Sequence, residues 1–464
     1  MITELAVRGH VLHLVADRPE SGGGIEMVGR LSDSCSGVTY GWMPQRGDMD
    51  WLAFATGVRL THDYLRYATR FYDAAPRLRE RSRERTPDLG VRLVSAASRF
   101  GSFGISCLRA ALDLVEESIP VPSAYESFLS EIAPDVVLLT PLVDLGSPQL
   151  DLLKATRRLG LRTVLCVGSW DHLSSKALIR IRPDLVTVWN EVQKREAIEM
   201  HGLPDEMIAV TGAQCYDQWF DRQPIRDRVT FCTTVGLPAE RPFLLYVCSS
   251  PFRGEPPEAN YVCRWIQAIR ASTHERLRTA GILVRPHPSR LHEWEGRNLS
   301  ALGPVVLFGR NPIDDKARQD YFESLWYSAA VVGLNTSAFL EAGIVGKSIH
   351  AVCPQEHAAS QTGTLHFHYL LDVGGGLVRA ARTLDEHVQH VSRTLDTPVP
   401  SNVNRVFLET FIRPGGLDVA ATPRFADTVE ALASQVASPT CVSSWRGRML
   451  APLVGLAAGV RSSR

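Results

Sequence analysis

The sequence predicts an α/β protein whose two halves each hold a parallel sheet covered by helices. Three observations favour this fold class. Short apolar runs that suit buried strands alternate with amphipathic helical stretches. At 464 residues the chain exceeds one ordinary core. Between Asp221 and Glu240 prolines and charges interrupt the alternation, which predicts a linker. We expect an N-terminal domain at 1–225, a second domain at 226–422, and a helical tail at 423–464 that packs back on the first domain.

The first half begins with an expected strand at Leu5–Ala16, followed by the glycines Gly22–Gly24. Those glycines either let a ligand approach the backbone or form a flexible loop. His62–Arg85 predicts a long helix, whose aromatic residues either meet an acceptor or a membrane surface or face the core. Strands are then expected at 134–140, 162–167, 185–189 and 207–211, with helices at 147–159 and 190–201.

The second half repeats this rhythm. Strands are expected at 243–248, 282–284, 305–308, 330–332 and 348–352, and helices at 259–279 and 318–329. Gln361–Tyr369 alternates polar and aromatic residues, which predicts a strand or loop that lines a ligand site. Thr422 should cap the tail helix and Pro423 begin it, with Phe425, Val429, Leu432 and Val436 on one stripe.

Composition narrows the function classes. Lys plus Arg and Asp plus Glu number 50 each, so no overall charge favours nucleic acid. Nine cysteines without a CxxC pair fit buried thiols in a reducing compartment. The first residues lack the features of a signal peptide, and no apolar run reaches the ~20 residues of a membrane span. We therefore expect a cytoplasmic protein, with the inner face of a membrane as an alternative location.

Val331–Lys347 holds the features that a phosphate-bearing ligand requires. An apolar strand breaks at Gly333, and Asn335, Thr336 and Ser337 can each cap a helix that Gly346 ends. Backbone N–H groups at such a junction favour a phosphate. Glu341, one turn further on, would accept hydrogen bonds from sugar hydroxyls. The alternative is a capped βα unit with a solvated glutamate.

A second group of residues follows another strand. In Arg285-Pro286-His287-Pro288, two prolines fix the backbone around a histidine at the strand's carboxyl end, where its N–H can reach a phosphate. Arg285 would add charge if it faces the same way. The alternative is a tight turn. Ser249 and Ser250, at the end of the first strand of the second domain, are further candidates for phosphate contact.

These residues resemble a known family. Arg285-Pro286-His287-Pro288 together with Asn335–Ala342 and Gly346-Lys347 is similar to the donor half of GT-B glycosyltransferases, and most of all to bacterial capsule-synthesis, sialyltransferase and glycerophosphotransferase groups. The resemblance implies two Rossmann-like domains facing each other across a cleft. It also implies that His287, Thr336 and Ser337 hold the phosphate of a cytidine-type donor and that Glu341 binds donor hydroxyls.

Pro204–Gln214, followed by Tyr216-Asp217, resembles the crossover of GT-B enzymes and of non-hydrolysing sugar-nucleotide 2-epimerases. The glutamate and arginine signature of those epimerases is missing. The resemblance covers residues 130 to 390 as architecture and only the short motifs as chemistry.

An inverting transferase needs a base near the acceptor hydroxyl, in the first domain. Asp171 is the first candidate, since it lies in a loop after a strand, and His172 and Asp144 are weaker ones. The alternative for Asp171 is an Asx turn or a helix N-cap. Trp189-Asn190 either contacts the acceptor or begins a helix. Asp48-Met49-Asp50 spells a DxD pattern outside the donor half, and no metal need be invoked.

The sequence thus predicts a glycosyltransferase that moves a sugar from a nucleotide-activated donor during surface-glycan or glycoconjugate synthesis. The alternatives are a sugar-nucleotide 2-epimerase and a catalytically silent binding module. The expected partners are a nucleotide sugar, with a cytidine-linked one as the first choice, and a glycan, lipid-linked or small-molecule acceptor. No cofactor is expected beyond the nucleotide sugar as co-substrate, and peripheral association with a membrane stays an open alternative.

Overall fold

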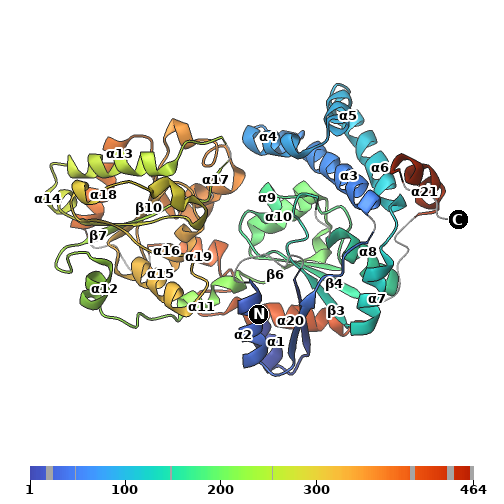
Figure 1. Ribbon diagram of the computed structural model, residues 1–464, viewed down its shortest axis with the longest axis horizontal. Helices are drawn as coiled ribbons and strands as arrows, with labels where there is room; N and C mark the ends of the chain where they lie inside the picture. Colours follow the sequence, from blue (N-terminus) through green and yellow to red (C-terminus); the bar gives the residue numbers. More distant parts are fainter. Residues whose placement is uncertain are drawn as a thin grey trace. The chain divides into compact units, whose positions relative to one another are not determined.

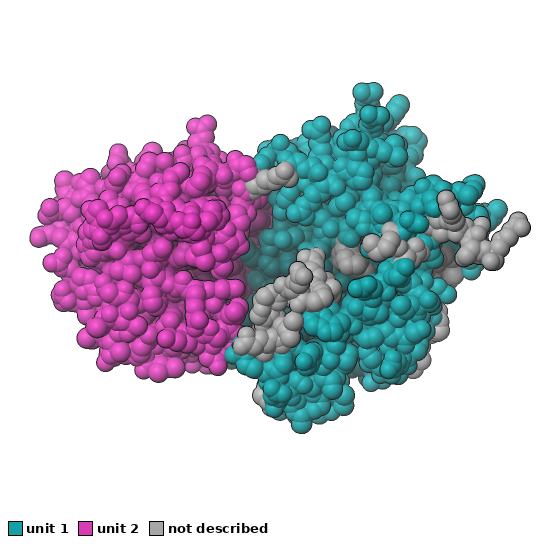
Figure 2. All heavy atoms as spheres, in the orientation of Figure 1, with its two compact units in different colours: residues 1–215, 413–464 teal, residues 216–412 magenta. Residues whose placement is uncertain are grey.

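The structure is a computed structural model that describes residues 1–16, 24–47, 49–146, 149–252, 254–397, 403–435 and 444–459. The chain forms two compact units, coloured separately in Figure 2. Unit 1 contains residues 1–215 and 413–464, and unit 2 contains residues 216–412. The expected boundaries, after residues 225 and 422, lie further along the chain than these two crossing points.

Unit 2 contains a six-stranded parallel sheet in the order β12-β11-β10-β7-β8-β9. The strands are β7 Phe243–Val247, β8 Gly281–Arg285, β9 Val305–Leu307, β10 Ala330–Gly333, β11 Ile349–Val352 and β12 Val378–Ala381. The chain starts at the centre with β7, adds β8 and β9 on one side, and then crosses to β10 on the other. The strand order therefore reverses between β7 and β10, and ligands of open parallel sheets bind at such switch points.

Helices cover both faces of this sheet (Figure 1). Helices α13, α14 and α18 enclose a core on one face, to which α13 contributes a helical stripe of Val262, Trp265, Ile266 and Ile269. Helices α15 and α16 pack on the other face. The helices of unit 2 are α11 Asp217–Phe220, α12 Arg228–Val235, α13 Glu258–Arg270, α14 Glu275–Arg278, α15 Asp315–Tyr327, α16 Ala338–Ile344, α17 Leu365–Asp372, α18 Leu384–Asp396 and α19 Arg405–Phe411.

Unit 1 contains a four-stranded parallel sheet in the order β3-β4-β5-β6 and a separate parallel pair, β1-β2. The strands are β1 Leu12–Ala16, β2 Val38–Trp42, β3 Val136–Leu139, β4 Arg162–Cys166, β5 Leu185–Val188 and β6 Ile208–Val210. The helices are α1 Ile2–Val7, α2 Gly24–Ser34, α3 Met49–Tyr67, α4 Pro76–Arg85, α5 Asp88–Ser98, α6 Gly101–Ser118, α7 Ser123–Ile132, α8 Gln149–Leu159, α9 His172–Ser175, α10 Glu191–His201, α20 Ala421–Ala433 and α21 Trp445–Ala457.

The segment that returns to unit 1 packs on its sheet. Phe425, Val429 and Leu432 of α20 are buried against Val164 and Cys166 of β4. The helix begins at Ala421 with Ala420 as its N-cap, so the expected cap at Thr422 is wrong. None of the described helices is both long enough and apolar enough to cross a bilayer.

Five further expectations of secondary structure are wrong. The helix expected at 259–279 is divided into α13 and α14. Residues 5–16 form the end of α1 and then β1 instead of one strand. The helix expected at 62–85 is broken between α3 and α4, and the linker expected at 221–240 contains α12. Residues 365–369 begin helix α17, so they are not a strand.

The aromatic residues of the broken helix belong to the core, because Tyr64, Tyr67 and Tyr72 are buried, although Phe71 is 45% exposed. Gly22, Gly23, Asp48 and Val436 lie outside the described residues.

Candidate functional site

The candidate donor residues of unit 2 follow three neighbouring strands. Ser249 and Ser250 come after β7, His287 comes after β8, and Asn335–Ser337 come after β10. Because these strands are parallel and adjacent, all three segments leave the same edge of the sheet. Strands lie about 4.8 Å apart, so the outer two segments emerge roughly 10 Å apart, a span that one phosphate and two side chains can bridge.

The switch point between β7 and β10 is closed by a chain of hydrogen bonds. The amide of Asn335 donates to Ser249 Oγ at 3.1 Å, and the amide of Ser249 donates to Glu258 Oε2 at 2.8 Å. Glu258 Oε1 accepts from the Tyr246 hydroxyl at 3.1 Å. Burial raises the pKa of Glu258 to about 7. Glu258 therefore positions the loop after β7. In the sequence, the one sign of this role is that Glu258 follows Pro256-Pro257 at the expected start of a helix.

His287 presents one N–H group. It is the N-cap of the 3₁₀ helix Pro288–Trp294, where its Nδ1 accepts a hydrogen bond from the amide of Ser289 at 3.2 Å. Nδ1 is therefore unprotonated and the proton of the neutral ring lies on Nε2. Desolvation, and then the charge of Arg290, lowers the pKa of His287. At neutral pH the imidazole is an uncharged donor.

The segment after β10 supplies further donors. Thr336 Oγ1 accepts from the amide of Ala338 at 3.3 Å, which caps α16, whereas Ser337 is exposed and makes no side-chain cap. The amides of Thr336 and Ser337 donate to none of the described residues. Asn335 Nδ2 donates to Ser360 O at 2.5 Å and lies 3.4 Å from His366 Nε2. Asn335 thus orders the segment, while Ser337 and two backbone amides stay available to a ligand.

Arg285 does not join this group. Its side chain is buried beside β9 and α15, with Cζ 5.0 Å from the centroid of the Tyr321 ring. Nη1 donates to Ser324 Oγ at 3.2 Å and Nη2 to Arg310 O at 3.3 Å. The guanidinium also fills the space above Gly309, where a Cβ atom would lie 2.4 Å from Cζ. Arg285 therefore shapes the loop after β9.

Glu341 lies on the same side of the sheet as Tyr321. Its Oε2 accepts a hydrogen bond from the Tyr321 hydroxyl. Burial raises the pKa of Glu341 to about 7. One carboxyl oxygen is thus already occupied, and the binding of sugar hydroxyls by the other stays a prediction.

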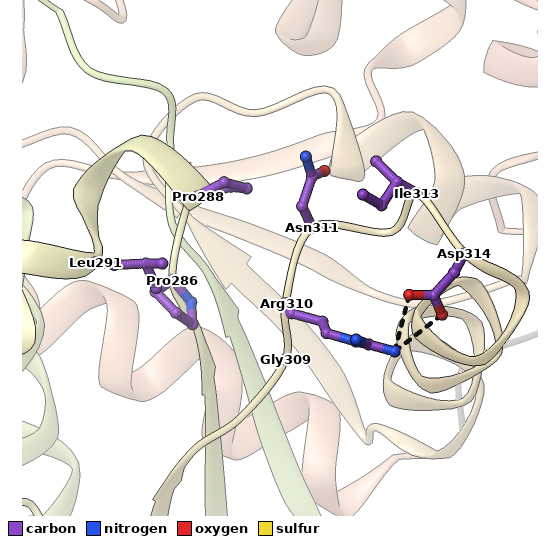
Figure 3. Close-up of a pocket in the computed structure, with 8 residues that line it drawn as sticks. All are labelled: Pro286, Pro288, Leu291, Gly309, Arg310, Asn311, Ile313 and Asp314. Atoms are coloured by element: carbon purple, nitrogen blue, oxygen red, sulfur yellow. Dashed lines mark hydrogen bonds and ion pairs between the residues drawn. The ribbon is translucent and has the colours of Figure 1, made fainter. Parts of the chain in front are cut away.

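A pocket of about 320 Å³ lies beside the segment that follows β8 (Figure 3). Pro286 and Pro288, the two neighbours of His287, form one wall, and the loop after β9 forms the other. Side chains of Leu291 and Ile313 add apolar surface, and Asn311 adds a polar group. Apolar walls with a few polar atoms suit a flat heterocycle.

The loop after β9 was missed from the sequence. It contains Gly309, Arg310 and Asn311-Pro312 directly after a short strand, at the edge where ligands were expected. Arg310 Nη2 pairs with Asp314 Oδ2 at 2.8 Å, which closes the loop onto the start of α15 (Figure 3).

In unit 1, Asp171 is held by two serines. Its Oδ1 accepts from Ser169 Oγ at 2.5 Å and its Oδ2 from Ser175 Oγ at 2.8 Å. Asp171 is the N-cap residue of the short helix α9, although its side chain makes no capping bond to an amide. The carboxylate is therefore oriented by hydroxyls.

His172 is less suited to accept a proton. Its Nδ1 accepts from the amide of Gly168 at 3.3 Å, so the ring proton lies on Nε2. Desolvation lowers the pKa of His172. Trp189 and Asn190 are buried, and Asn190 Oδ1 accepts from the amide of Gln193 at 3.0 Å. The capping interpretation of Asn190 is thus confirmed.

Within the described part of the chain, no three His, Cys, Asp or Glu side chains are grouped so that they could hold a metal ion.

No protein-family model and no curated protein matches the chain. Among solved structures, a glycosyltransferase from Rickettsia africae is similar over 94% of this chain and 93% of its own, with 11% identity and a TM-score of 0.52. The fold class is GT-B. Each unit carries a Rossmann-like domain of this class, which confirms the fold predicted from the sequence, while the cleft expected between the domains stays a prediction.

Two other solved structures are less similar. The UDP-GlcNAc 2-epimerase from Methanocaldococcus jannaschii has 11% identity over 90% of this chain and 99% of its own, with a TM-score of 0.48. CalG4, the calicheamicin glycosyltransferase, has 15% identity over 94% of both chains, with a TM-score of 0.43.

Proposed function

We propose that this protein is a glycosyltransferase that moves a sugar from a nucleotide-activated donor to an acceptor, without a metal ion. The observation that carries the proposal is the grouping of His287, Ser249 and Asn335–Ser337 at the switch point of the unit 2 sheet, beside a pocket. The GT-B fold is in keeping with this activity, although a fold alone does not define one.

The donor would bind in three parts. Its base would enter the pocket between Pro286-Pro288 and the loop after β9. Its phosphate would accept hydrogen bonds from His287 Nε2–H, from the hydroxyl of Ser337 and from the amides of Thr336 and Ser337. Its sugar would lie toward Glu341, whose Oε2 is shared with Tyr321. Ser250, which is exposed, would contact the phosphate from the loop after β7.

These phosphate contacts come from neutral donors, since His287 is uncharged and the Arg285 cation is engaged elsewhere. As the bond between the sugar carbon and the phosphate oxygen breaks, negative charge grows on the departing nucleotide. Fixed N–H and O–H groups stabilise that charge without reorganising. A bond from the acceptor oxygen to the same carbon forms, and the acceptor proton must pass to a base.

Asp171 is the base that we propose. The hydroxyls of Ser169 and Ser175 hold its carboxylate in one orientation, in a loop that follows β4. His172 Nδ1 accepts a hydrogen bond from the amide of Gly168. The Nε2–H group of His172 would therefore donate a hydrogen bond to the acceptor substrate. By the sequence resemblance, a glycan or lipid-linked molecule of a bacterial surface conjugate is the acceptor to test first.

The test begins with a thermal-shift screen of nucleotides and nucleotide sugars, with cytidine compounds first and uridine compounds next. NMR then follows each binding nucleotide sugar during incubation without an acceptor. A transferase hydrolyses the nucleotide sugar slowly, an epimerase interconverts it with its 2-epimer, and a silent module does neither. Absence of nucleotide binding, or interconversion of the sugar, would overturn the proposal.

A further inference from the structure

A stripe of exposed apolar residues runs along α21, the last helix of unit 1. Trp445, Met449, Leu453 and Leu456 are 61%, 70%, 63% and 75% exposed. At 100° per residue, these four positions fall within about 80° of arc on the helix. Single exposed apolar residues are common, but four large ones on one stripe of a 13-residue helix indicate a surface that meets an apolar partner.

The opposite side of α21 is fixed to the unit. Val454 is buried with Trp51 and Ile119, and Leu450 packs against the same cluster. The approach is close, because a Cβ atom on Gly447 would lie 2.9 Å from the Cβ of Glu117. Ser444 Oγ caps the helix by accepting from the amide of Gly447 at 3.2 Å. The apolar stripe is therefore held outward by packing on the other face.

Helix α6, on which α21 packs, is held in place by ion pairs to its neighbours. In Figure 1, α21 lies beside α6, the helix with which it makes most of its contacts. Glu116 of α6 is buried and pairs with Arg59 of α3 at 2.9 Å and with Lys154 of α8 at 3.3 Å. These ion pairs connect α6 to two neighbouring helices, so α21 is presented on a firm support.

The charges around the stripe point to an anionic partner. Arg446 and Arg448 fall about 20° beyond one edge of the stripe and about 60° beyond the other, so a cation flanks it on each side. No acidic residue follows Glu430 in the sequence, whereas four arginines do. An apolar stripe with a tryptophan at one end and arginines along both sides is the pattern of helices that lie in the interface of an anionic bilayer.

Two further exposed rings lie at the start of α6, the helix on which α21 packs. Phe100, the N-cap of α6, and Phe103 are 73% and 74% exposed. Two large exposed rings thus lie at the start of the helix that supports α21.

We propose that α21 is a membrane-surface element, which inserts its apolar stripe into the interface of a bilayer that contains anionic lipid. The helix would lie along the surface, since 13 residues extend for about 20 Å, whereas a bilayer core is about 30 Å thick. This inference is independent of the proposed donor site, and it identifies a surface for the enzyme to work on.

The test is co-sedimentation of the full chain with vesicles of phosphatidylcholine containing about one third phosphatidylglycerol, compared with pure phosphatidylcholine. We expect the protein to bind the anionic vesicles and to bind them less well as salt is raised. Met449→Glu/Leu453→Glu should weaken this binding at least tenfold, because it places charge in the stripe. Val229→Glu is the matched control, since Val229 is 63% exposed on α12 of unit 2 and should have no effect.

The melting temperature of the double variant checks its fold, and it should stay that of the parent, because both side chains are exposed. If the double variant fails to fold, single Leu456→Glu replaces it. Failure of the parent to bind anionic vesicles, or equal binding by the variant, would overturn the proposal. So would a dimer that the substitutions dissociate without any vesicle binding, which would assign the stripe to a second copy of the chain. Nucleotide binding is measured separately, so the two proposals fail independently.

Discussion

His287→Ala removes the donor around which the proposed phosphate site is built. In the structure Nδ1 is occupied by the Ser289 amide, so Nε2–H is the group that the ring offers to a ligand. A hydrogen bond from a neutral donor to a phosphate is worth about 1.5–3 kcal/mol, because the acceptor is charged. We therefore expect the dissociation constant for the nucleotide to rise about 10- to 150-fold.

Isothermal titration calorimetry with the best nucleotide of the screen measures this change. His292→Ala is the matched control, because His292 is an exposed histidine on the same 3₁₀ helix and should not alter affinity. A dissociation constant within about twofold of the parent's in His287→Ala would refute the donor assignment, since that change is only about 0.4 kcal/mol. Equal losses in both variants would show that the helix, and not the imidazole, was disturbed.

The pH dependence tests the protonation state of the same ring. Desolvation and Arg290 lower the pKa of His287, so the ring is already neutral at pH 7 in the free protein. Affinity should therefore stay level as the pH rises from about 7 to about 9, above the ordinary histidine pKa of about 6.5. A steady loss of affinity that disappears in His287→Ala would show that the ring binds as a cation, contrary to the structure.

Three further predictions concern the base, the loop after β9 and the core of unit 2. Asp171→Asn should leave nucleotide affinity unchanged and lower turnover about 10²- to 10⁴-fold, measured as product release in a coupled assay. Gly309→Ala should lower the unfolding free energy by about 3 kcal/mol, because φ is +113° and the new Cβ would lie 2.4 Å from Arg285 Cζ. Gly296→Ala, at φ +72° in open space, should show only the smaller backbone cost. Burial lowers the pKa of His387 to about 3, so the unfolded chain takes up a proton first and stability falls as the pH drops below about 6.5. His387→Gln, which keeps an acceptor for Trp265 Nε1, should reduce the loss of stability between about pH 7 and about pH 5 by about 2 kcal/mol in denaturant titrations.

A different result would contradict each of these three predictions. Full turnover in Asp171→Asn would remove that residue as the base. Equal destabilisation by Gly309→Ala and Gly296→Ala would show that Arg285 adapts without cost. An unchanged pH slope in His387→Gln would mean that the ring titrates alike in the folded and unfolded chains.

The sequence was sufficient for the three central strands of the unit 2 sheet, because these strands are buried along their whole length. β7, β8 and β10 are runs of apolar residues bounded by polar ends, and each lies within two residues of its expected place. The edge at which ligands were expected also follows from sequence, since it depends only on the order of parallel strands. The sequence did not show that β10 pairs with β7, and this pairing is what brings Ser249 into contact with Asn335.

Tertiary contacts explain the helices that sequence patterns misjudged. The break after Tyr67 has no glycine or proline before Pro76 to announce it. Instead, the hydroxyls of Tyr67 and Tyr72 donate to the carbonyls of Lys176 and Ser174, at 2.7 and 3.0 Å, which draws the chain out of the helix. The six-residue helix α1 is too short to show a helical period. Its apolar residues were therefore predicted to belong to the same strand as those of β1.

The direction of a side chain at a strand end was also beyond the sequence. Arg285 and His287 are two residues apart, yet the arginine is buried against Tyr321 and Ser324 while the imidazole is half-buried at the sheet edge. Only the missing Cβ of Gly309, 24 residues later, makes room for that arginine. No local pattern around 285 records this contact.

A crystal structure of the protein with cytidine or uridine diphosphate tests the donor site most directly. We predict that a phosphate oxygen lies within hydrogen-bonding distance of His287 Nε2 and of the Ser337 hydroxyl, with the base between Pro288 and Ile313. A nucleotide bound elsewhere, or one whose base occupies the pocket while its phosphates point away from His287 and Ser337, would contradict the account.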